Sequence, residues 1–327
     1  MLYRNGENLK LGLLDYLSHK SKITIFCPYI KASKLREIID DCNMKCEQMV
    51  VRWEPRDLAS GASDIEIYEI CKEYGITLYM NSRIHLKLFT NDYEDAFLGS
   101  ANLSERAYSD DINNCNYEVN VRLDRLNVDD KLYLEKIIQS SILVDDFLYQ
   151  NIKAQISENS TINEKDSFDL PNSSTNESDF FINKLPMTES PELLWQFYSE
   201  QLNLTNLEEN CYVHDLVLYK IEPGIEFENI FYEILAERFF GLTFIKTFLL
   251  EVDEAKRTDK YSNIRNGLQF GAVRKWFSEK TTTVPSPRPF KLTRNVQILY
   301  KWIEKLSNGE YEVSVPGRHS QVITKRN

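Results

Sequence analysis

A short stretch of the chain holds a histidine and a lysine at a spacing that suits phosphate chemistry. His85 and Lys87 stand two residues apart, so in an extended segment both side chains project from the same face. Ile84, Leu86 and Leu88 then fill the opposite face, as buried residues do. The pair places an imidazole, a competent nucleophile toward phosphorus, beside an ammonium that neutralises negative charge.

A second group of polar residues follows closely in the sequence. The apolar run 96–98 ends at Gly99, Ser100 and Asn102. We expect the glycine to let the backbone approach a ligand, because it lacks a side chain. The serine and the asparagine, together with Lys87, are expected to hold the non-bridging oxygens of a phosphate.

These residues resemble the signature of the phospholipase D superfamily, which is His, any residue, Lys, four residues, Asp, six residues, then Gly-Ser-any-Asn. His85, Lys87, Asp92 and the run 99–102 fill every specified position. The resemblance implies a metal-independent phosphodiesterase in which His85 forms a phosphohistidine and a second acid protonates the leaving oxygen. Asp92 is expected to organise a hairpin turn rather than to touch the substrate.

The family completes its site with two motif copies that face each other across a pseudo-twofold axis, and this chain has one copy. The other histidines, at positions 19, 214 and 319, lack the accompanying residues. The resemblance therefore implies a homodimer with the active site on its twofold axis. It also implies a downstream carboxylate that orients the histidine. Glu118 is the candidate for that role, and Glu105 is left open.

The elements around the motif alternate between strand and helix. This pattern is typical of an α/β layer, and the resemblance implies a phospholipase D-like mixed sheet flanked by helices in a catalytic domain of residues 1–150. We predict helices at 8–18, 33–41, 64–74 and 128–150, and strands at 22–30, 48–53, 76–80, 85–89, 96–99 and 116–123. Strands 85–89 and 96–99 are expected to form a hairpin.

A further stretch carries a second resemblance. Val50-Val51-Arg52-Trp53, followed by Asp57-Leu58 and Gly61-Ala62-Ser63-Asp64, looks like the corresponding part of the phospholipase D-like restriction endonucleases. These are single-motif enzymes that dimerise and carry a separate DNA-reading domain. The resemblance implies a restriction or anti-phage defence nuclease. In those enzymes a β-barrel domain recognises the DNA, whereas the corresponding part of this sequence predicts helices. A second interpretation is therefore that an ATPase or helicase subunit brings the DNA to the chain.

The rest of the chain divides into a polar linker and a mainly helical C-terminal domain. Residues 151–190 are rich in Ser, Thr, Asn, Glu and Asp, which predicts a linker with a disordered part. Residues 191–327 are expected to bind DNA or a partner. Helices are predicted at 191–202, 226–254, 266–280 and 292–306, and a hairpin at 310–324 turns at Pro316-Gly317. Helices followed by a hairpin suggest a winged-helix-like domain.

Charge is unevenly distributed along this acidic chain. The net charge is −11, yet residues 256–327 hold fifteen basic and five acidic side chains, a balance of +10. A basic terminal module favours DNA as the partner. The candidate DNA-binding residues are Arg274, Lys275, Arg288, Lys291, Arg294 and Arg318. The interleaved Trp276, Phe277, Tyr300 and Trp302 are expected either to stack on bases or to lie in the core.

Other features narrow the function classes. No apolar run approaches the length of a membrane span, and residues 1–20 lack a signal-peptide core, so a cytoplasmic protein is expected. The six cysteines lack the spacing of a zinc site, and no cofactor is expected. Two alternatives stay open: a phospholipid-hydrolysing enzyme, and a nucleic-acid-binding scaffold with a dead site. DNA and RNA are not distinguished.

Overall fold

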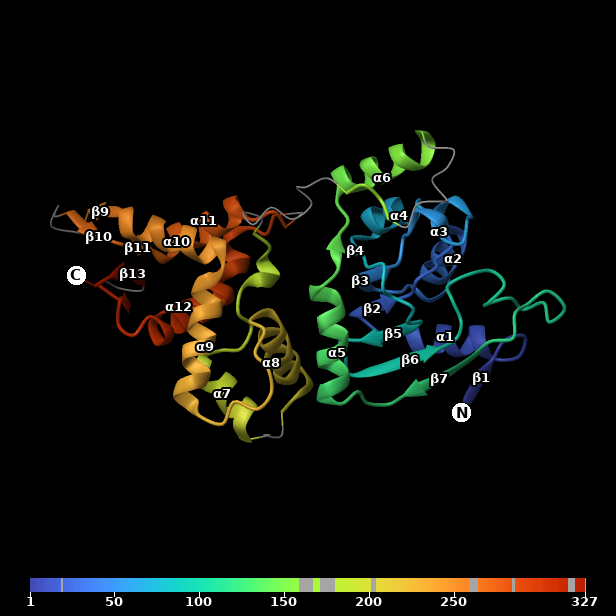
Figure 1. The fold of residues 1–327 in the computed structure, drawn as a ribbon, viewed down its shortest axis with the longest axis horizontal. Coiled ribbons are helices and arrows are strands. Elements are labelled where there is room, and N and C mark those ends of the chain that lie inside the picture. The colour runs from blue at the N-terminus through green and yellow to red at the C-terminus, as the bar shows by residue number, and fades with distance from the viewer. Residues whose placement is uncertain are drawn as a thin grey trace. The chain divides into compact units, whose positions relative to one another are not determined.

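The computed structural model describes most of the chain, which folds into two compact units, Met1–Ser174 and Thr175–Asn327 (Figure 1). The described residues are 1–18, 20–158, 167–170, 180–200, 204–258, 264–283, 286–316 and 321–326. Each unit has its own helices and its own sheet, and each is described by itself.

The first unit is built on one eight-stranded mixed sheet. Its strand order is β1-β7-β6-β5-β2-β3-β4-β8, in which β2, β3 and β4 are parallel and the other pairings are antiparallel. This confirms the predicted α/β class. The strands are β1 (Leu2–Arg4), β2 (Ile23–Phe26), β3 (Cys46–Val51), β4 (Thr77–Met80), β5 (Leu88–Asn91), β6 (Asp95–Gly99), β7 (Val119–Leu123) and β8 (Ile142–Leu143).

Helices cover both faces of this sheet, because successive strand residues point to opposite sides. Ile25 of β2 belongs to a core formed with α1, α2, α4 and α6, while its neighbour Phe26 packs with Leu134 and Ile138 of α5 on the other face. The helices are α1 (Leu9–Leu17), α2 (Ala32–Cys42), α3 (Pro55–Ala59), α4 (Ile67–Tyr74), α5 (Val128–Gln139) and α6 (Asp146–Glu158).

Three predictions for the first unit were wrong in detail. The single helix predicted at 128–150 is two helices, because Ser140 and Ser141 both donate side-chain hydrogen bonds to the carbonyl of Ile137 and end α5 there. Residues 84–87 precede β5 instead of lying within it. The short helix α3 was not predicted.

The second unit is mainly helical, as predicted, with two small sheets. Its helices are α7 (Pro191–Glu200), α8 (Asn206–Leu218), α9 (Glu228–Gly241), α10 (Thr243–Glu254), α11 (Phe270–Lys280) and α12 (Thr293–Leu306), with short 3₁₀ turns η2 (Ile182–Lys184) and η3 (Pro289–Leu292). The strands β9 (Lys256–Thr258) and β10 (Ile264–Asn266) form one hairpin, and β11 (Leu268–Gln269), β13 (Val322–Lys325) and β12 (Tyr311–Ser314) form a three-stranded sheet.

The predictions for the second unit need three corrections. The helix predicted at 226–254 is broken at Leu242, whose backbone is extended between α9 and α10. Helix α8 was missed, and the helix predicted at 266–280 begins only at Phe270, after the strands β10 and β11. The hairpin at 310–324 is present, although its predicted turn residue at 317 lies outside the described residues.

The predicted linker is partly structured. Residues 151–158 belong to α6, and residues 182–184 form η2. Both ends of the predicted linker therefore contain helical segments. Residues 159–166 and 171–179, where disorder was predicted, lie outside the described part of the chain.

The aromatic side chains proposed for base stacking belong mostly to the core. Phe277, Tyr300 and Trp302 are buried, and Trp276 packs against Phe248 and Phe277. Their helical spacing matches the buried faces of α11 and α12. The core alternative therefore holds for Phe277, Tyr300 and Trp302, whereas Trp276 is half-buried.

Candidate active site

His85 and Lys87 lie side by side at the start of β5. The Lys87 ammonium is 3.4 Å from Nδ1 and 3.3 Å from Nε2 of His85, and it donates a hydrogen bond of 2.9 Å to the His85 carbonyl. Ile84 and Leu88 are buried on the opposite side, as the two-residue alternation predicted. The imidazole is exposed, whereas only 8% of Lys87 is accessible. A buried cation thus lies beside an exposed imidazole.

The electrostatics of this pair keep the imidazole uncharged. The positive charge of Lys87 lowers the pKa of His85, and partial burial and Arg52 lower it further. Burial likewise lowers the pKa of Lys87, while Cys27 and Glu118 act in the opposite direction. A histidine with a lowered pKa is neutral at pH 7, which is the state in which a ring nitrogen can attack phosphorus.

The two halves of the motif meet through the backbone. The Gly99 N–H donates to the Lys87 carbonyl at 3.1 Å. A side chain at Gly99 could not be accommodated, because its Cβ would lie 2.1 Å from the carbonyl oxygen of Val119 and 2.3 Å from Oδ1 of Asn120. The glycine is therefore required for packing against β7.

Ser100 and Glu118 form a second contact at the site. The Ser100 hydroxyl donates to a Glu118 carboxylate oxygen and accepts the Val119 N–H at 3.1 Å. Asn116 donates to the other Glu118 oxygen at 3.3 Å. Glu118 thus lies at the site, but its described partners are Ser100 and Asn116 and not His85. Glu105, the alternative carboxylate, accepts from the hydroxyl of Ser33.

Asn102 and Asp92 have different surroundings. The side-chain oxygen of Asn102 lies 3.9 Å from the Cys27 sulfur, whose pKa is raised to about 11 by burial. Asp92 lies in the turn between β5 and β6, where it pairs with Lys22 at 3.1 Å. Asp92 and Tyr93 both have positive φ, as a tight hairpin turn of this hand requires. The expected turn role of Asp92 is consistent with this position.

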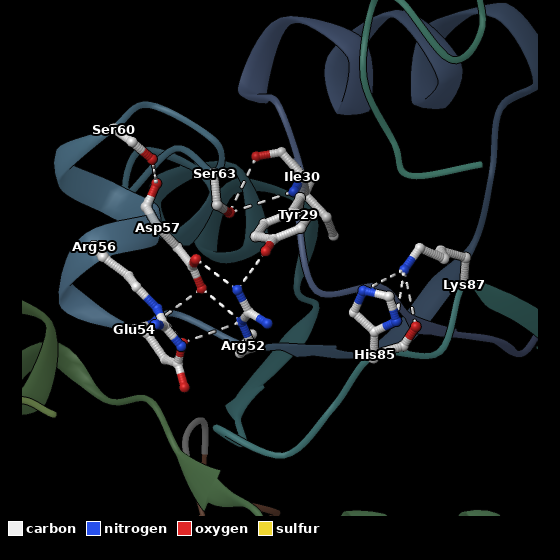
Figure 2. A network of polar contacts seen from close by, with 10 residues as sticks. All are labelled: Tyr29, Ile30, Arg52, Glu54, Arg56, Asp57, Ser60, Ser63, His85 and Lys87. Atoms are coloured by element: carbon white, nitrogen blue, oxygen red, sulfur yellow. Dashed lines mark hydrogen bonds and ion pairs between the residues drawn. The ribbon is translucent and has the colours of Figure 1, made fainter. Parts of the chain in front are cut away.

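Arg52 is a further cation beside the pair, and Figure 2 shows it in the same view as His85 and Lys87. Its guanidinium makes two 2.7 Å hydrogen bonds with the buried carboxylate of Asp57 and lies 4.8 Å from the centre of the Tyr29 ring, whose hydroxyl it also contacts. Because Arg52 lowers the pKa of both His85 and Lys87, its charge acts on the site.

The loop after Arg52 explains the second sequence resemblance. Asp57 holds Arg52 and also caps the short helix α3. The Ser63 hydroxyl bonds to the backbone of Ile30 (Figure 2). The following residue, Asp64, pairs with Lys31, so the loop fixes the segment that carries Tyr29. Asp57 thus contacts Arg52 directly, whereas Ser63 and Asp64 contact residues 30–32. The sequence marked this stretch only by resemblance and gave it no role in the site.

The backbone of Trp53, the residue after Arg52, has a strained conformation. It is buried and has a φ of 42°, in the left-handed region that a bulky residue rarely adopts. Such a conformation persists only where the surroundings hold it. The chain therefore turns sharply between Arg52 and helix α3, directly beside the site.

The candidate DNA-binding residues of the second unit divide by environment. Arg274 is half-buried, stacks on Phe270 at 5.1 Å and donates to the Thr293 hydroxyl at 2.9 Å, so it holds α11 against α12. Lys275, Arg288, Lys291 and Arg294 are exposed, and Arg318 lies outside the described residues. Exposed cations suit phosphate contacts, whereas Arg274 is committed to the fold.

Among the histidines that the structure describes, His85 is the one candidate nucleophile. His214 is buried between Asp215 at 2.9 Å and the carbonyl of Asn183 at 2.6 Å, so it belongs to the core. His19 and His319 lie outside the described part. Among the described residues, no three His, Cys, Asp or Glu side chains gather as a metal site requires, and no helix there is long and apolar enough to cross a bilayer.

Comparisons with known proteins give likeness at the level of structure alone. No family model and no curated protein matches the sequence. Among solved structures, a phospholipase D family member, Nuc from Salmonella typhimurium, is 15% identical over 45% of this chain and 97% of its own, with a TM-score of 0.36. NucT from Helicobacter pylori is 16% identical over 44% of this chain and all of its own, with a TM-score of 0.34.

A third structure resembles a larger share of the chain. Phosphatidylserine synthase from Haemophilus influenzae Rd KW20 is 14% identical over 52% of this chain and 46% of its own, with a TM-score of 0.34.

Proposed function

We propose that the chain is a phospholipase D superfamily phosphodiesterase that cleaves DNA through a phosphohistidine intermediate formed on His85. The observation that carries the proposal is the contact between an exposed imidazole of lowered pKa and the buried ammonium of Lys87. The loop with Ser100 and Asn102 joins this pair through the Gly99 hydrogen bond. A neutral nucleophile, a fixed cation and neutral hydrogen-bond donors meet the needs of phosphoryl transfer.

The reaction proceeds in two displacements. A ring nitrogen of His85 attacks phosphorus, the P–N bond forms, and the bond to one ester oxygen breaks. That oxygen leaves as an alcohol after it takes a proton from an acid on the opposite side. Water then attacks the phosphohistidine, loses a proton to the same group, and releases a phosphomonoester and free His85. Lys87 and Arg52 neutralise the charge of the five-coordinate transition states.

The acid comes from a second copy of the chain, whose own His85 lies across a twofold axis and is protonated while the attacking His85 is neutral. The uncovered part of the sheet supports this dimer. Leu2 of β1 and Val119 and Leu123 of β7 are 59%, 40% and 40% exposed, and Tyr117 just before β7 is fully exposed. Among these residues, Val119 donates its backbone N–H to Ser100, and Tyr117 is next to Glu118 in the sequence. An apolar surface beside half an active site is what a self-complementary interface needs.

DNA is favoured as the substrate by the basic segment 256–327, and a restriction or anti-phage defence role fits a nuclease with a separate basic unit. Lipid hydrolysis is the alternative in which the same motif chemistry acts on a headgroup phosphodiester. An ATPase or helicase subunit is a further partner consistent with a role in defence. A binding scaffold would keep the basic segment without turnover.

One experiment separates these functions. Purified protein is incubated in EDTA with plasmid DNA, RNA or phosphatidyl lipid vesicles, beside a His85→Ala variant. The proposal predicts cutting of plasmid DNA that persists in EDTA and is abolished in His85→Ala. Turnover of lipid alone, turnover only with added magnesium, or no turnover on any substrate would each contradict it.

The dimer has its own test. In Val119→Asp, a charge lies on the exposed face of β7, where it leaves the monomer core intact but opposes burial against a second copy. Sedimentation should show a dimer for the natural protein and a monomer for the variant. The rate of DNA cleavage should fall in proportion to the fraction of dimer that is lost. An active monomer would contradict the shared site. Glu94→Gln, a surface change at the β5–β6 turn, is the control.

A further inference from the structure

The last elements of the second unit follow one another as helix, strand, helix, helix and hairpin. They are α10, β11, α11, α12 and the pair β12 and β13, with the β9–β10 hairpin inserted after α10. The three strands form one antiparallel sheet in which β13 lies between β11 and β12, and α12 packs against both α11 and β12 (Figure 1). A helix pair followed by a β-hairpin is the arrangement of a winged helix-turn-helix.

Helix α12 occupies the place of the second, recognition helix in this arrangement. Its buried side consists of Val296, Leu299, Tyr300, Trp302, Ile303 and Leu306. Its outer side carries Arg294, Gln297 and Lys301, which are exposed and are spaced by three and four residues, so they lie along one face. Guanidinium and amide groups are the side chains that make paired hydrogen bonds with purine edges.

The outer side of α12 faces a groove that the hairpin helps to form. The residues that line it are Glu189, Arg294, Gln297, Ile298, Tyr300, Lys301, Glu304, Val313 and Gln321. Two of these belong to or adjoin β12 and β13, so the hairpin lies next to the exposed helix face. In DNA-bound helix-turn-helix domains the recognition helix enters the major groove while neighbouring segments contact the backbone.

Hydrogen bonds fix α12 in this position. The Glu304 carboxylate accepts the Val313 N–H at 2.9 Å, which ties the helix to the hairpin. The Trp302 indole donates to the Thr188 carbonyl at 2.9 Å, and Arg274 reaches Thr293 at the first turn. The exposed face is therefore presented by a rigid support, as a reading surface needs.

The surrounding charge is complementary to DNA, with two exceptions. Arg288 and Lys291 precede α12, Lys275 lies on α11, and all three are exposed within a segment of net charge +10. The exceptions line the groove: Glu189 pairs with Lys301 at 2.6 Å, and Glu304 accepts the Val313 N–H. Lys301 is thus partly neutralised in the free protein, while Arg294 and Gln297 remain available.

We infer that α12 is a recognition helix, that Arg294 and Gln297 read base edges in the major groove of duplex DNA, and that the β12–β13 hairpin lies over the adjacent backbone. The inference rests on the proposed function only for its choice of DNA as the ligand. It adds that the second unit selects sequence, which a basic patch alone does not do.

The test measures binding without cleavage. Full-length protein carrying His85→Ala is mixed in EDTA with a pool of random 30-base-pair duplexes, and bound duplexes are selected and sequenced. The inference predicts enrichment of a common motif. A fluorescein-labelled duplex with that motif and a scrambled duplex of the same composition then serve as probes for fluorescence anisotropy.

Substitutions in the same His85→Ala background separate base reading from phosphate contact. Gln297→Ala removes an exposed, uncharged group, so it should lower affinity for the motif duplex roughly tenfold or more and leave the scrambled duplex unchanged. Lys291→Ala should weaken both duplexes equally and reduce the slope of log affinity against log salt by about 0.9. Arg238→Ala, on the helix whose Phe239 packs behind α12 against Trp302, is the matched charge control.

The outcomes distinguish this inference from the proposed function. Absence of an enriched motif, or a Gln297→Ala protein that still prefers the motif, would overturn the role of α12 whether or not the natural protein cuts DNA. Conversely, if binding to an enriched motif depends on Gln297 but the natural protein has no nuclease activity, the recognition helix would be supported and the proposed catalysis would be contradicted.

Discussion

The two units hold their positive charges in opposite ways. In the first unit, Lys87 is buried beside His85, and Arg52 is clamped by Asp57 and Tyr29. In the second, Arg294 and Lys301 stand exposed along one face of α12. A buried, fixed cation stabilises charge that develops during a reaction without reorganising, whereas exposed cations attract a polyanion from solution and are screened by salt. Under the proposed function, this difference assigns turnover to the first unit and DNA binding to the second.

The strongest test of this comparison is Lys87→Met, which removes the buried charge while it keeps the aliphatic stem. We expect kcat to fall by a factor on the order of 10²–10³, because a transition-state cation is lost, while duplex affinity stays within about twofold. Plasmid cleavage and anisotropy measure the two quantities.

Lys45→Met is the control for that substitution. This exposed lysine precedes the start of β3, at the end of the strand remote from Arg52. A fall in affinity that equals the fall in kcat would show that Lys87 serves binding and would erase the distinction between the units.

The Arg52 cluster gives the next largest effect. Arg52→Gln should reduce kcat about tenfold to a hundredfold with little change in KM, because a fixed cation beside the reacting phosphate is lost. Rescue by Arg52→Lys should be partial, since a lysine cannot make the paired bonds to Asp57. Single-turnover cleavage provides the rates.

A purely structural role for Arg52 predicts a different result. In that case thermal stability would fall with activity, and the titration of His85 would not change. Unfolding temperature and the His85 pKa of Arg52→Gln therefore decide between the two roles.

A smaller effect is expected in the second unit from Glu189→Gln. The change frees Lys301 from its 2.6 Å ion pair and removes a negative charge from the groove. Duplex affinity at low salt should rise by about twofold to fivefold, in keeping with the modest worth of exposed ion pairs, and the gain should shrink as salt rises. A fall in duplex affinity, or a gain in affinity that persists in high salt, would show that DNA does not bind in the groove beside Glu189.

The smallest effect is a shift in titration. Since Lys87 and Arg52 lower the pKa of His85, its midpoint by NMR should lie below that of an unperturbed histidine, and the neutral nucleophile should persist to lower pH. Lys87→Met should raise that midpoint, so less neutral imidazole remains at mildly acidic pH. An unchanged midpoint would mean that the two charges do not interact.

Local spacing was enough to predict most of the first unit. The β5–β6 hairpin and the turn at Asp92 follow from alternation and turn chemistry over a few residues. The pairing of His85 with Lys87 follows in the same way. Such features depend on residues that are close in the sequence, so they can be predicted from one sequence alone.

Features that depend on distant residues were predicted poorly. Gly99 is required by β7 and Asn120, and Glu118 contacts Ser100, which no local pattern encodes. The break at Leu242 likewise arises from packing among helices. The role of Arg52 required Asp57 and Tyr29 to converge from separate segments. Tertiary contact, and not propensity, decided each of these.

The central claim is that His85 becomes covalently bonded to phosphorus, and it can be measured directly. Natural protein and His85→Ala are mixed with labelled duplex DNA in EDTA, quenched in alkali during the first turnover, and digested for mass spectrometry. The account predicts an acid-labile, alkali-stable phosphoryl adduct on the peptide that contains His85, and no adduct in the variant. Rapid DNA cleavage by the natural protein without that adduct, or an adduct on another residue, would contradict it.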